Sequence, residues 1–126
     1  MKLQSLRRLA IVGLSFAAVA ANVSAHALVM NSMPAANETV AAGTVRVVLT
    51  FNSRIDKKRS RVTVYSSDAQ QTPVALVAEN AENVLRGDAV LTQAGAYQIR
   101  WQVLSRDGHI TRGIIPFAVA GAKAPQ

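Results

Sequence analysis

Large apolar residues occupy every second position in two stretches of the chain, residues 45–51 and 97–103. Successive side chains of a β-strand point to opposite faces, so each stretch predicts a strand with one face in a hydrophobic core. The second stretch includes Trp101, which we therefore expect in the core rather than at a ligand-binding surface. Its core face is formed by Tyr97, Ile99, Trp101 and Val103.

Shorter apolar runs separated by turn residues predict further strands. We expect these at residues 27–32, 61–66, 73–78 and 114–119. Pro116 lacks the amide hydrogen that a central strand donates, so the last run is expected at a sheet edge or a bulge. Gly, Asp and Ser mark turns at residues 42–43, 67–68, 86–88, 94–95 and 107–108.

This pattern favours an all-β fold. Residues 26–126 show no convincing amphipathic helix, internal repeat or linker, so we expect them to form one domain. Several short strands with regularly spaced turns are typical of an immunoglobulin-like antiparallel β-sandwich or Greek-key barrel.

Residues 1–25 have the features of a cleaved secretory signal peptide. Lys2, Arg7 and Arg8 precede an almost wholly apolar run over residues 9–21, and Val23-Ser24-Ala25 provides the small residues at which such signals are cut. The run is shorter than the roughly 20 residues of a spanning helix. An uncleaved N-terminal anchor is the alternative, but we expect an exported protein that begins at His26.

Composition limits the chemistry that this exported domain can perform. The chain has no cysteine, so any metal must be held by nitrogen, oxygen or methionine sulfur. A domain of this size can bury a core without disulfides. The whole chain has 14 basic and 7 acidic residues, and because three basic residues fall in the signal segment, the exported domain is only moderately basic.

A basic cluster in residues 54–61 has two interpretations. Its members are Arg54, Lys57, Lys58, Arg59 and Arg61. They form either a patch for an acidic partner or lipid headgroups, or a solvated loop and strand edge where lysine discourages aggregation. Few exposed aromatic residues are expected nearby, which argues against binding to nucleic acid.

The positions of the two histidines suggest a metal site. Cleavage after Ala25 would leave His26 with both a free amine and an imidazole, which can chelate one ion. Asp107-Gly108-His109 would add a carboxylate and a second imidazole. Three nitrogens and one oxygen suit tetragonal Cu(II), which also leads the divalent affinity order. Alternatively, Asp107-Gly108 is an ordinary hairpin turn beside a solvated His109.

Three segments resemble the CopC family of small periplasmic copper-binding proteins. They are the opening His26-Ala27-Leu28-Val29 with Ser32, Pro34 and Ala35; residues 45–51; and residues 95–109 with Gly113 and Phe117. The last segment is the most specific, and residues 56–92 match only loosely. The resemblance implies an immunoglobulin-like β-barrel that binds Cu(II) through the amine and side chain of His26, through Asp107 and through His109.

The chain departs from the family pattern in two places. Some members hold Cu(I) in a methionine-rich segment, but no methionine follows Met33 here. Met30 and Met33 are expected in the core or a loop, so we expect a Cu(II)-only member. Some relatives also carry an acidic residue shortly after the position of Phe51, where this chain reads Asn52-Ser53-Arg54.

Together these features favour a monomeric, non-enzymatic protein that carries or buffers Cu(II) in the periplasm, in copper resistance or homeostasis. An inner-membrane copper transport protein is its expected partner. Two alternatives remain open. An N-terminal histidine with a second imidazole also resembles the copper brace of polysaccharide oxygenases, which would make the protein an oxidative enzyme. A metal-free β-sandwich that docks through its basic edge is the other alternative.

Overall fold

The computed structural model describes residues 26–121; the expected signal peptide and residues 122–126 lie outside the described residues. Within residues 26–121 the chain forms strands and no helix, so this part contains no helical candidate for a membrane span. The strands are β1 (Val29–Met33), β2 (Thr39–Ala41), β3 (Gly43–Phe51), β4 (Ile55–Ser66), β5 (Gln71–Pro73), β6 (Ala75–Leu76), β7 (Val84–Leu91), β8 (Gly95–Ser105) and β9 (Ile110–Ala120).

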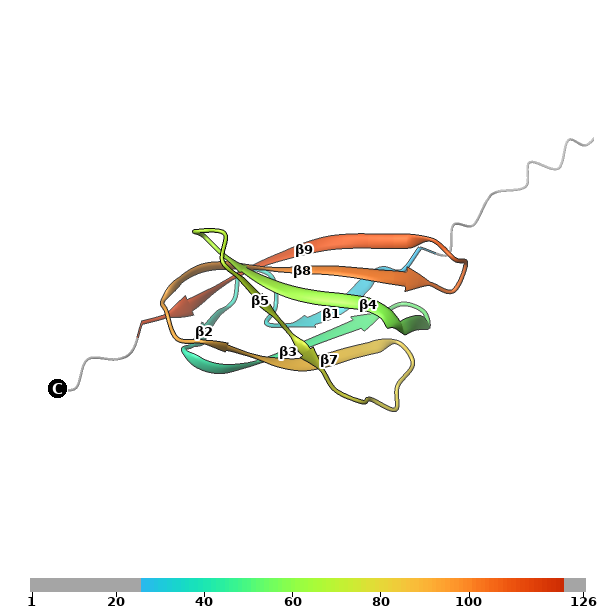
Figure 1. The fold of residues 1–126 in the computed structure, drawn as a ribbon, viewed down its shortest axis with the longest axis horizontal. Coiled ribbons are helices and arrows are strands. Elements are labelled where there is room, and N and C mark those ends of the chain that lie inside the picture. Colours follow the sequence, from blue (N-terminus) through green and yellow to red (C-terminus); the bar gives the residue numbers. More distant parts are fainter. Residues whose placement is uncertain (1–25, 122–126) are drawn as a thin grey trace, which may run out of the picture.

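The strands form two sheets that face each other (Figure 1). One sheet has the order β1-β3-β7-β6 and the other the order β2-β9-β8-β4-β5. Neighbouring strands are antiparallel, except that the short β2 runs parallel to the end of β9. The expected all-β, immunoglobulin-like sandwich is therefore confirmed.

The core lies between the sheets and is built mainly by the two alternating stretches. Leu49 of β3 and Ile99 of β8 are fully buried. Trp101 is 8% exposed, and its ring meets Phe51 edge to face with the centroids 5.2 Å apart. Such aromatic packing stabilises a core beyond the area it buries, and it confirms the core position predicted for Trp101.

Residues 73–78, expected as one strand, are divided between the two sheets. β5 ends at Pro73 and pairs with β4, whereas β6 begins at Ala75 and pairs with β7. Between them, buried Val74 donates its amide hydrogen to the carbonyl oxygen of Val62 at 3.0 Å. A run of apolar residues does not reveal that the chain changes sheets, because Val74 faces the core in either case.

The turn expected at residues 86–88 is wrong, because these residues lie in the middle of β7. A Cβ atom at Gly87 would lie 2.4 Å from the carbonyl oxygen of Ala75 and 2.7 Å from Cγ1 of Val74. Glycine is therefore required where the crossing segment passes close to the strand, a recognised use of glycine inside sheets.

Other boundaries also differ from the expectations. β1 begins at Val29, and β4 begins at Ile55 rather than at residue 61, so β4 includes most of the basic cluster. The other expected turns fall at strand boundaries. Pro116 precedes the part of β9 that pairs with β2, so it lies at the edge of the sheet as expected. The short β2 itself was not predicted.

The long hairpin of β8 and β9 determines where the candidate site forms. Its register runs from Gly95 opposite Val119 to Leu104 opposite Ile110, which places the connecting turn at one end of the sandwich. The start of the described chain, blue in Figure 1, passes beside this turn. Residues from both ends of the sequence thus meet at one end of the fold.

Gly87→Ala should destabilise the protein by about 1–3 kcal/mol, the usual cost of forcing a methyl group into a close-packed site. Elsewhere in a strand, replacing glycine with alanine generally helps, because alanine loses less backbone entropy on folding. Gly121→Ala is the control, since its Cβ would meet only Ala94 at 3.7 Å. Urea denaturation measures both variants, and equal stability of Gly87→Ala and the wild type would contradict the close approach.

Candidate metal centre

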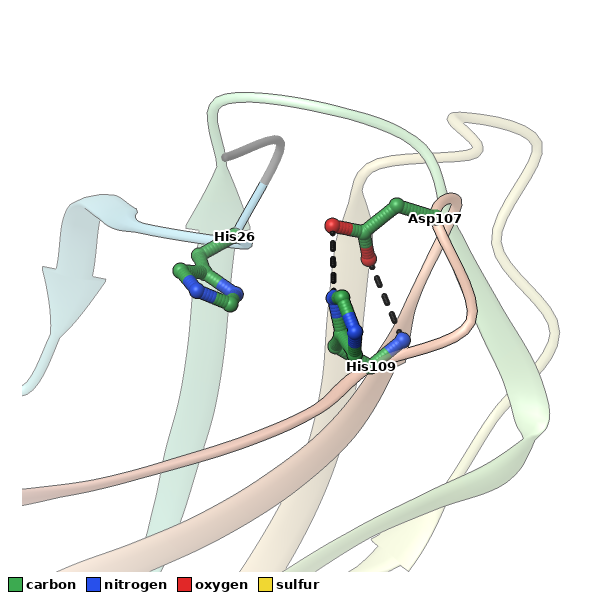
Figure 2. A group of neighbouring side chains, drawn as sticks. All are labelled: His26, Asp107 and His109. Atoms are coloured by element: carbon green, nitrogen blue, oxygen red, sulfur yellow. Dashed lines mark hydrogen bonds and ion pairs between the residues drawn. The ribbon is translucent and has the colours of Figure 1, made fainter. Parts of the chain in front are cut away.

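Asp107 and His109 are held together within the β8–β9 turn. One carboxylate oxygen of Asp107 accepts the backbone N–H of His109 at 3.1 Å, and the other lies 3.0 Å from the Nδ1 atom of the His109 ring. Gly108 between them has a φ of 84°, a left-handed conformation that glycine adopts without strain. The sequence Asp-Gly-His therefore turns both side chains toward the same side (Figure 2).

Ser105 fixes the orientation of this turn from inside the fold. It is the last residue of β8 and is only 3% exposed. Its hydroxyl contacts the Asp107 carboxylate and lies 2.8 Å from the carbonyl oxygen of His109, which also accepts the Ser105 amide hydrogen. Sequence reasoning assigned no role to Ser105. The available signal was a serine two residues before an aspartate in a turn, a pattern that forms local hydrogen bonds.

A second set of contacts fixes the segment that carries His26. The next residue, Ala27, is fully buried. The backbone N–H of Leu28 donates to the side-chain oxygen of Asn52 at 2.8 Å. In return, the backbone N–H of Asn52 donates to the carbonyl oxygen of Leu28 at 2.9 Å. Asn52 therefore anchors the start of the domain beside the β8–β9 turn. It belongs to the segment after Phe51 in which some relatives were expected to carry an acidic residue.

The structure brings all three predicted site residues together. The ring centroids of His26 and His109 are 5.5 Å apart, and the planes are tilted by 53°. His26, Asp107 and His109 each offer a donor atom, and these atoms lie within 4.8 Å of one another. Figure 2 shows the His26 ring facing the Asp107–His109 pair across a small gap. In the described part of the chain this is the one such cluster of histidine and acidic side chains.

The geometry of the cluster fits a divalent metal ion in two ways. Two ligands about 2.0–2.2 Å from one ion and at right angles to each other lie about 3 Å apart, which matches the separation between Asp107 and the Nδ1 atom of His109. Alternatively, Asp107 accepts a hydrogen bond from Nδ1 and leaves Nε2 of His109 as the ligand, as carboxylates often do beside metal-binding histidines. Either arrangement uses donors already in place.

Local hydrogen bonds keep Asp107 negatively charged. The Ser105 hydroxyl, followed by the His109 side chain and backbone, lowers the pKa of the Asp107 carboxyl from 3.8 to about 2. Asp107 is therefore ionised throughout the neutral range, and it places a negative charge beside the two imidazoles. An ionised carboxylate beside imidazole nitrogens suits divalent first-row metals better than Cu(I), which prefers thiolate and thioether ligands.

The two methionines near the start of the domain are not placed as expected. Met30 and Met33 are 68% and 54% exposed and belong to β1, the edge strand of its sheet. The expectation that they occupy the core or a loop is therefore wrong. The apolar character of the two residues gave the wrong signal, because among the described strands β1 pairs only with β3 and leaves much of its surface uncovered.

Comparisons with known proteins agree with the fold. A family model described as the CopC domain matches residues 29–120. The crystal structure of CopC from Methylosinus trichosporium OB3b is similar with a TM-score of 0.70 and 26% identity, covering 80% of this chain and 100% of that one.

Two curated proteins are also similar in sequence. Protein YobA of Escherichia coli K12 is 27% identical over 115 residues, which cover 89% of this chain and 93% of YobA. The copper transport protein CutJ of Bacillus subtilis is 25% identical over 101 residues, which cover 78% of this chain. The matched part is only 19% of CutJ, so this chain corresponds to about a fifth of that longer relative.

In metal-free protein, Asp107 should titrate with a pKa of about 2. Ser105→Ala should raise this pKa toward 3.8, because it removes the serine hydrogen bond that contributes most to lowering it. Because the folded-state pKa is depressed, the ionised carboxylate stabilises the fold above about pH 3.8, and this contribution is lost as the pH falls toward 2. Carboxyl carbon-13 NMR measures the titration directly.

Ser66→Ala is the matched control for this titration. Ser66 makes the equivalent contact with Asp68 in the β4–β5 turn and lowers the pKa of that carboxyl. This variant should raise the pKa of Asp68 and leave that of Asp107 unchanged. An Asp107 titration that is the same in Ser105→Ala as in the wild type would show that Ser105 does not hold the carboxylate.

Proposed function

The chain belongs to the CopC domain family, and on that premise we propose that it is an exported, non-enzymatic protein that carries or buffers Cu(II) in the periplasm, in copper resistance or homeostasis. Residues 1–25 are the signal peptide in this proposal, and residues 26–126 are the copper-binding domain. The observation that supports it most directly is the convergence of donor atoms from His26, Asp107 and His109 within 4.8 Å.

In this proposal, signal cleavage completes the ligand set. In the uncleaved chain the nitrogen of His26 belongs to a peptide bond, whose lone pair is delocalised and unavailable to a metal. Cleavage after Ala25 converts it to an amine with an ordinary pKa of about 7.7–8.0, which a strongly binding ion can deprotonate near neutral pH. The amine and the imidazole of His26 then chelate the ion together.

The donor set favours Cu(II) over Cu(I). It contains nitrogen and one ionised carboxylate, with no thiolate, and Cu(II) binds most tightly to such sites among the first-row divalent ions. The single carboxylate leaves a cupric site with one net positive charge, which is tolerable because all three side chains are exposed. The proposal is therefore a Cu(II)-only site.

Exposure of the site also suits a protein that exchanges its copper. In this proposal the ligands lie beside the β8–β9 turn, which is at one end of the sandwich (Figure 1). All three side chains are exposed, so a partner can reach them without opening the fold. The similar protein CutJ is a copper transport protein, and we propose that this chain works as a monomer that exchanges copper with an inner-membrane copper transporter.

An oxidative enzyme is the second candidate, favoured by the two imidazoles that face each other with centroids 5.5 Å apart. Copper-brace enzymes use neutral nitrogen ligands and cycle through Cu(I). A negatively charged Asp107 ligand would instead stabilise Cu(II) and oppose its reduction. For this reason the carrier is the better-supported function.

Mature protein beginning at His26 should bind one Cu(II) ion tightly in isothermal titration. Adding one alanine before His26 should weaken binding at least about 100-fold, since even indirect partners of metal ligands contribute about 10–100-fold. His109→Ala should weaken binding by a similar factor, whereas Ser66→Ala, at another turn, should leave it unchanged. Equal affinity of the extended and mature proteins would rule out the amine as a ligand.

Copper-loaded protein should consume little oxygen when ascorbate is supplied, with or without polysaccharide. Asp107→Asn should make Cu(II) easier to reduce, because it removes the negative charge that stabilises the higher oxidation state. An oxygen electrode and a redox titration measure the two effects. Rapid, substrate-dependent oxygen consumption by the wild type would favour the enzyme instead.

A further inference from the structure

The basic cluster of residues 54–61 is not one surface in the structure. Arg54 pairs with Glu82 at 2.6 Å, and Arg59 pairs with Asp56 at 3.9 Å. The Lys57 ammonium group donates hydrogen bonds to two backbone carbonyl oxygens. The cluster is thus partly neutralised within the fold, which supports its interpretation as a solvated loop and strand edge. Among residues 26–121, Lys58 and Arg61 are the members whose side chains form no ion pair or hydrogen bond.

Arg61 belongs to a different group of cations, on the outer face of the five-stranded sheet. It lies opposite Gln102 of β8, and Gln102 lies opposite Arg112 of β9. In the next row toward the far end of the sheet, Arg100 lies between Thr63 and Ile114. Neighbouring strands are about 4.8 Å apart, so three arginines that are distant in sequence surround Gln102. We call them the arginine face: Arg61, Arg100 and Arg112.

The arginine face has no neutralising partner in the described part of the chain. None of its guanidinium groups forms an ion pair among residues 26–121. By register the nearest acidic residue on this face is Asp56, opposite Leu104. Asp56 is already engaged by Arg59 and by two backbone N–H groups. The face therefore presents uncompensated positive charge.

Two of the guanidinium groups are held in position by uncharged neighbours. Arg100 stacks over the Tyr65 ring at 4.0 Å and donates to the side-chain oxygen of Gln98 at 3.1 Å. Arg112 donates to the side-chain oxygen of Gln102 at 2.8 Å. A guanidinium has five N–H donors, so each group keeps free donors while losing much of its flexibility. Such orientation lowers the entropy cost of binding an anion.

The three arginines also line one hollow. It has a volume of about 630 Å³, and its rim includes Ile114, which is 57% exposed. A concave surface with fixed donors is suited to carboxylate groups, because guanidinium pairs with them through two parallel hydrogen bonds. Both strands that carry Arg100 and Arg112 continue directly into the turn of Asp107 and His109.

We propose that the arginine face docks a carboxylate-rich segment of a partner protein next to the metal site. Arg112 is three residues from His109, about 10 Å along an extended strand, so a docked partner would have its own side chains within reach of the site. Docking itself needs no copper; that it serves copper exchange rests on the proposed function.

Protein carboxylates fit this face better than nucleic acid or lipid. Non-specific binding of single-stranded nucleic acid uses free aromatic faces for base stacking. The two aromatic residues that line this hollow offer none, because Tyr65 is stacked against Arg100 and Trp101 is only 8% exposed and packs against Phe51. Peripheral helices that bind lipid combine cations with several inserted apolar or aromatic residues. Here Ile114 is the one large exposed apolar side chain among the rows that carry the arginines.

The test uses copper-free mature protein and a fluorescein-labelled oligoglutamate peptide, followed by fluorescence anisotropy. The triple variant Arg61→Gln, Arg100→Gln, Arg112→Gln should bind the peptide at least about 10-fold more weakly, since it removes the charge-assisted pairs. The matched control is Arg46→Gln, Arg54→Gln, Arg59→Gln, which removes the same charge from residues paired elsewhere. It should weaken binding less than about 2-fold, because only long-range attraction changes.

Equal weakening in the two triple variants would overturn the proposal, because net charge alone would explain the binding. The proposal would also be overturned if the wild type did not bind the peptide but sedimented with phosphatidylglycerol vesicles, and the arginine-face variant did not sediment with them. Cu(II) titration separates this proposal from the function. The arginine-face variant should bind Cu(II) like the wild type. Loss of copper binding in wild type would refute the copper function alone, whereas failed peptide binding with normal Cu(II) affinity would refute docking alone.

Discussion

The antiparallel register between β8 and β9 is the constraint on which the rest of the candidate site depends. This pairing continues without a break from Gly95 to Leu104, so it determines both where the hairpin turns and which side chains face inward. It places Ser105 inside the fold as the final buried residue of β8. From there the serine orients Asp107, and a shift of the register by one residue would remove that contact, because alternate side chains of a strand face opposite sides.

The site is exposed, so its geometry must come from buried neighbours. Ala27 is fully buried one residue after His26, and Ser105 is buried two residues before Asp107. The candidate ligands are therefore carried by short segments with buried anchors, while their own side chains remain exposed. Asn52 links the first segment to the β3–β4 turn. This arrangement fits the proposed exchange of copper, because entry and release of an ion require no opening of the core.

The sequence predicted those parts of the fold that depend on alternation alone. β3 and β8 bury every second residue, and their core faces followed directly from the pattern. Gly87 and Val74 misled the prediction, because a glycine at a close crossing looks like a turn and a change of sheet leaves the pattern intact. His26, Asp107 and His109 could be selected by their chemistry, but their proximity depends on folding between distant segments.

Surface charge is a second property that the sequence alone did not predict. The basic residues adjacent in sequence are partly neutralised by Glu82, Asp56 and backbone carbonyls, whereas the arginine face combines residues from three strands. Only strand register reveals that second group. Arg100 and Arg112 lie on the same β8–β9 hairpin as Asp107 and His109, so an acidic partner would be attracted both to the arginine face and to the positive charge proposed for the cupric site. Attraction of this kind mainly speeds encounter and orients the partner, which is what rapid transfer of an exposed ion requires.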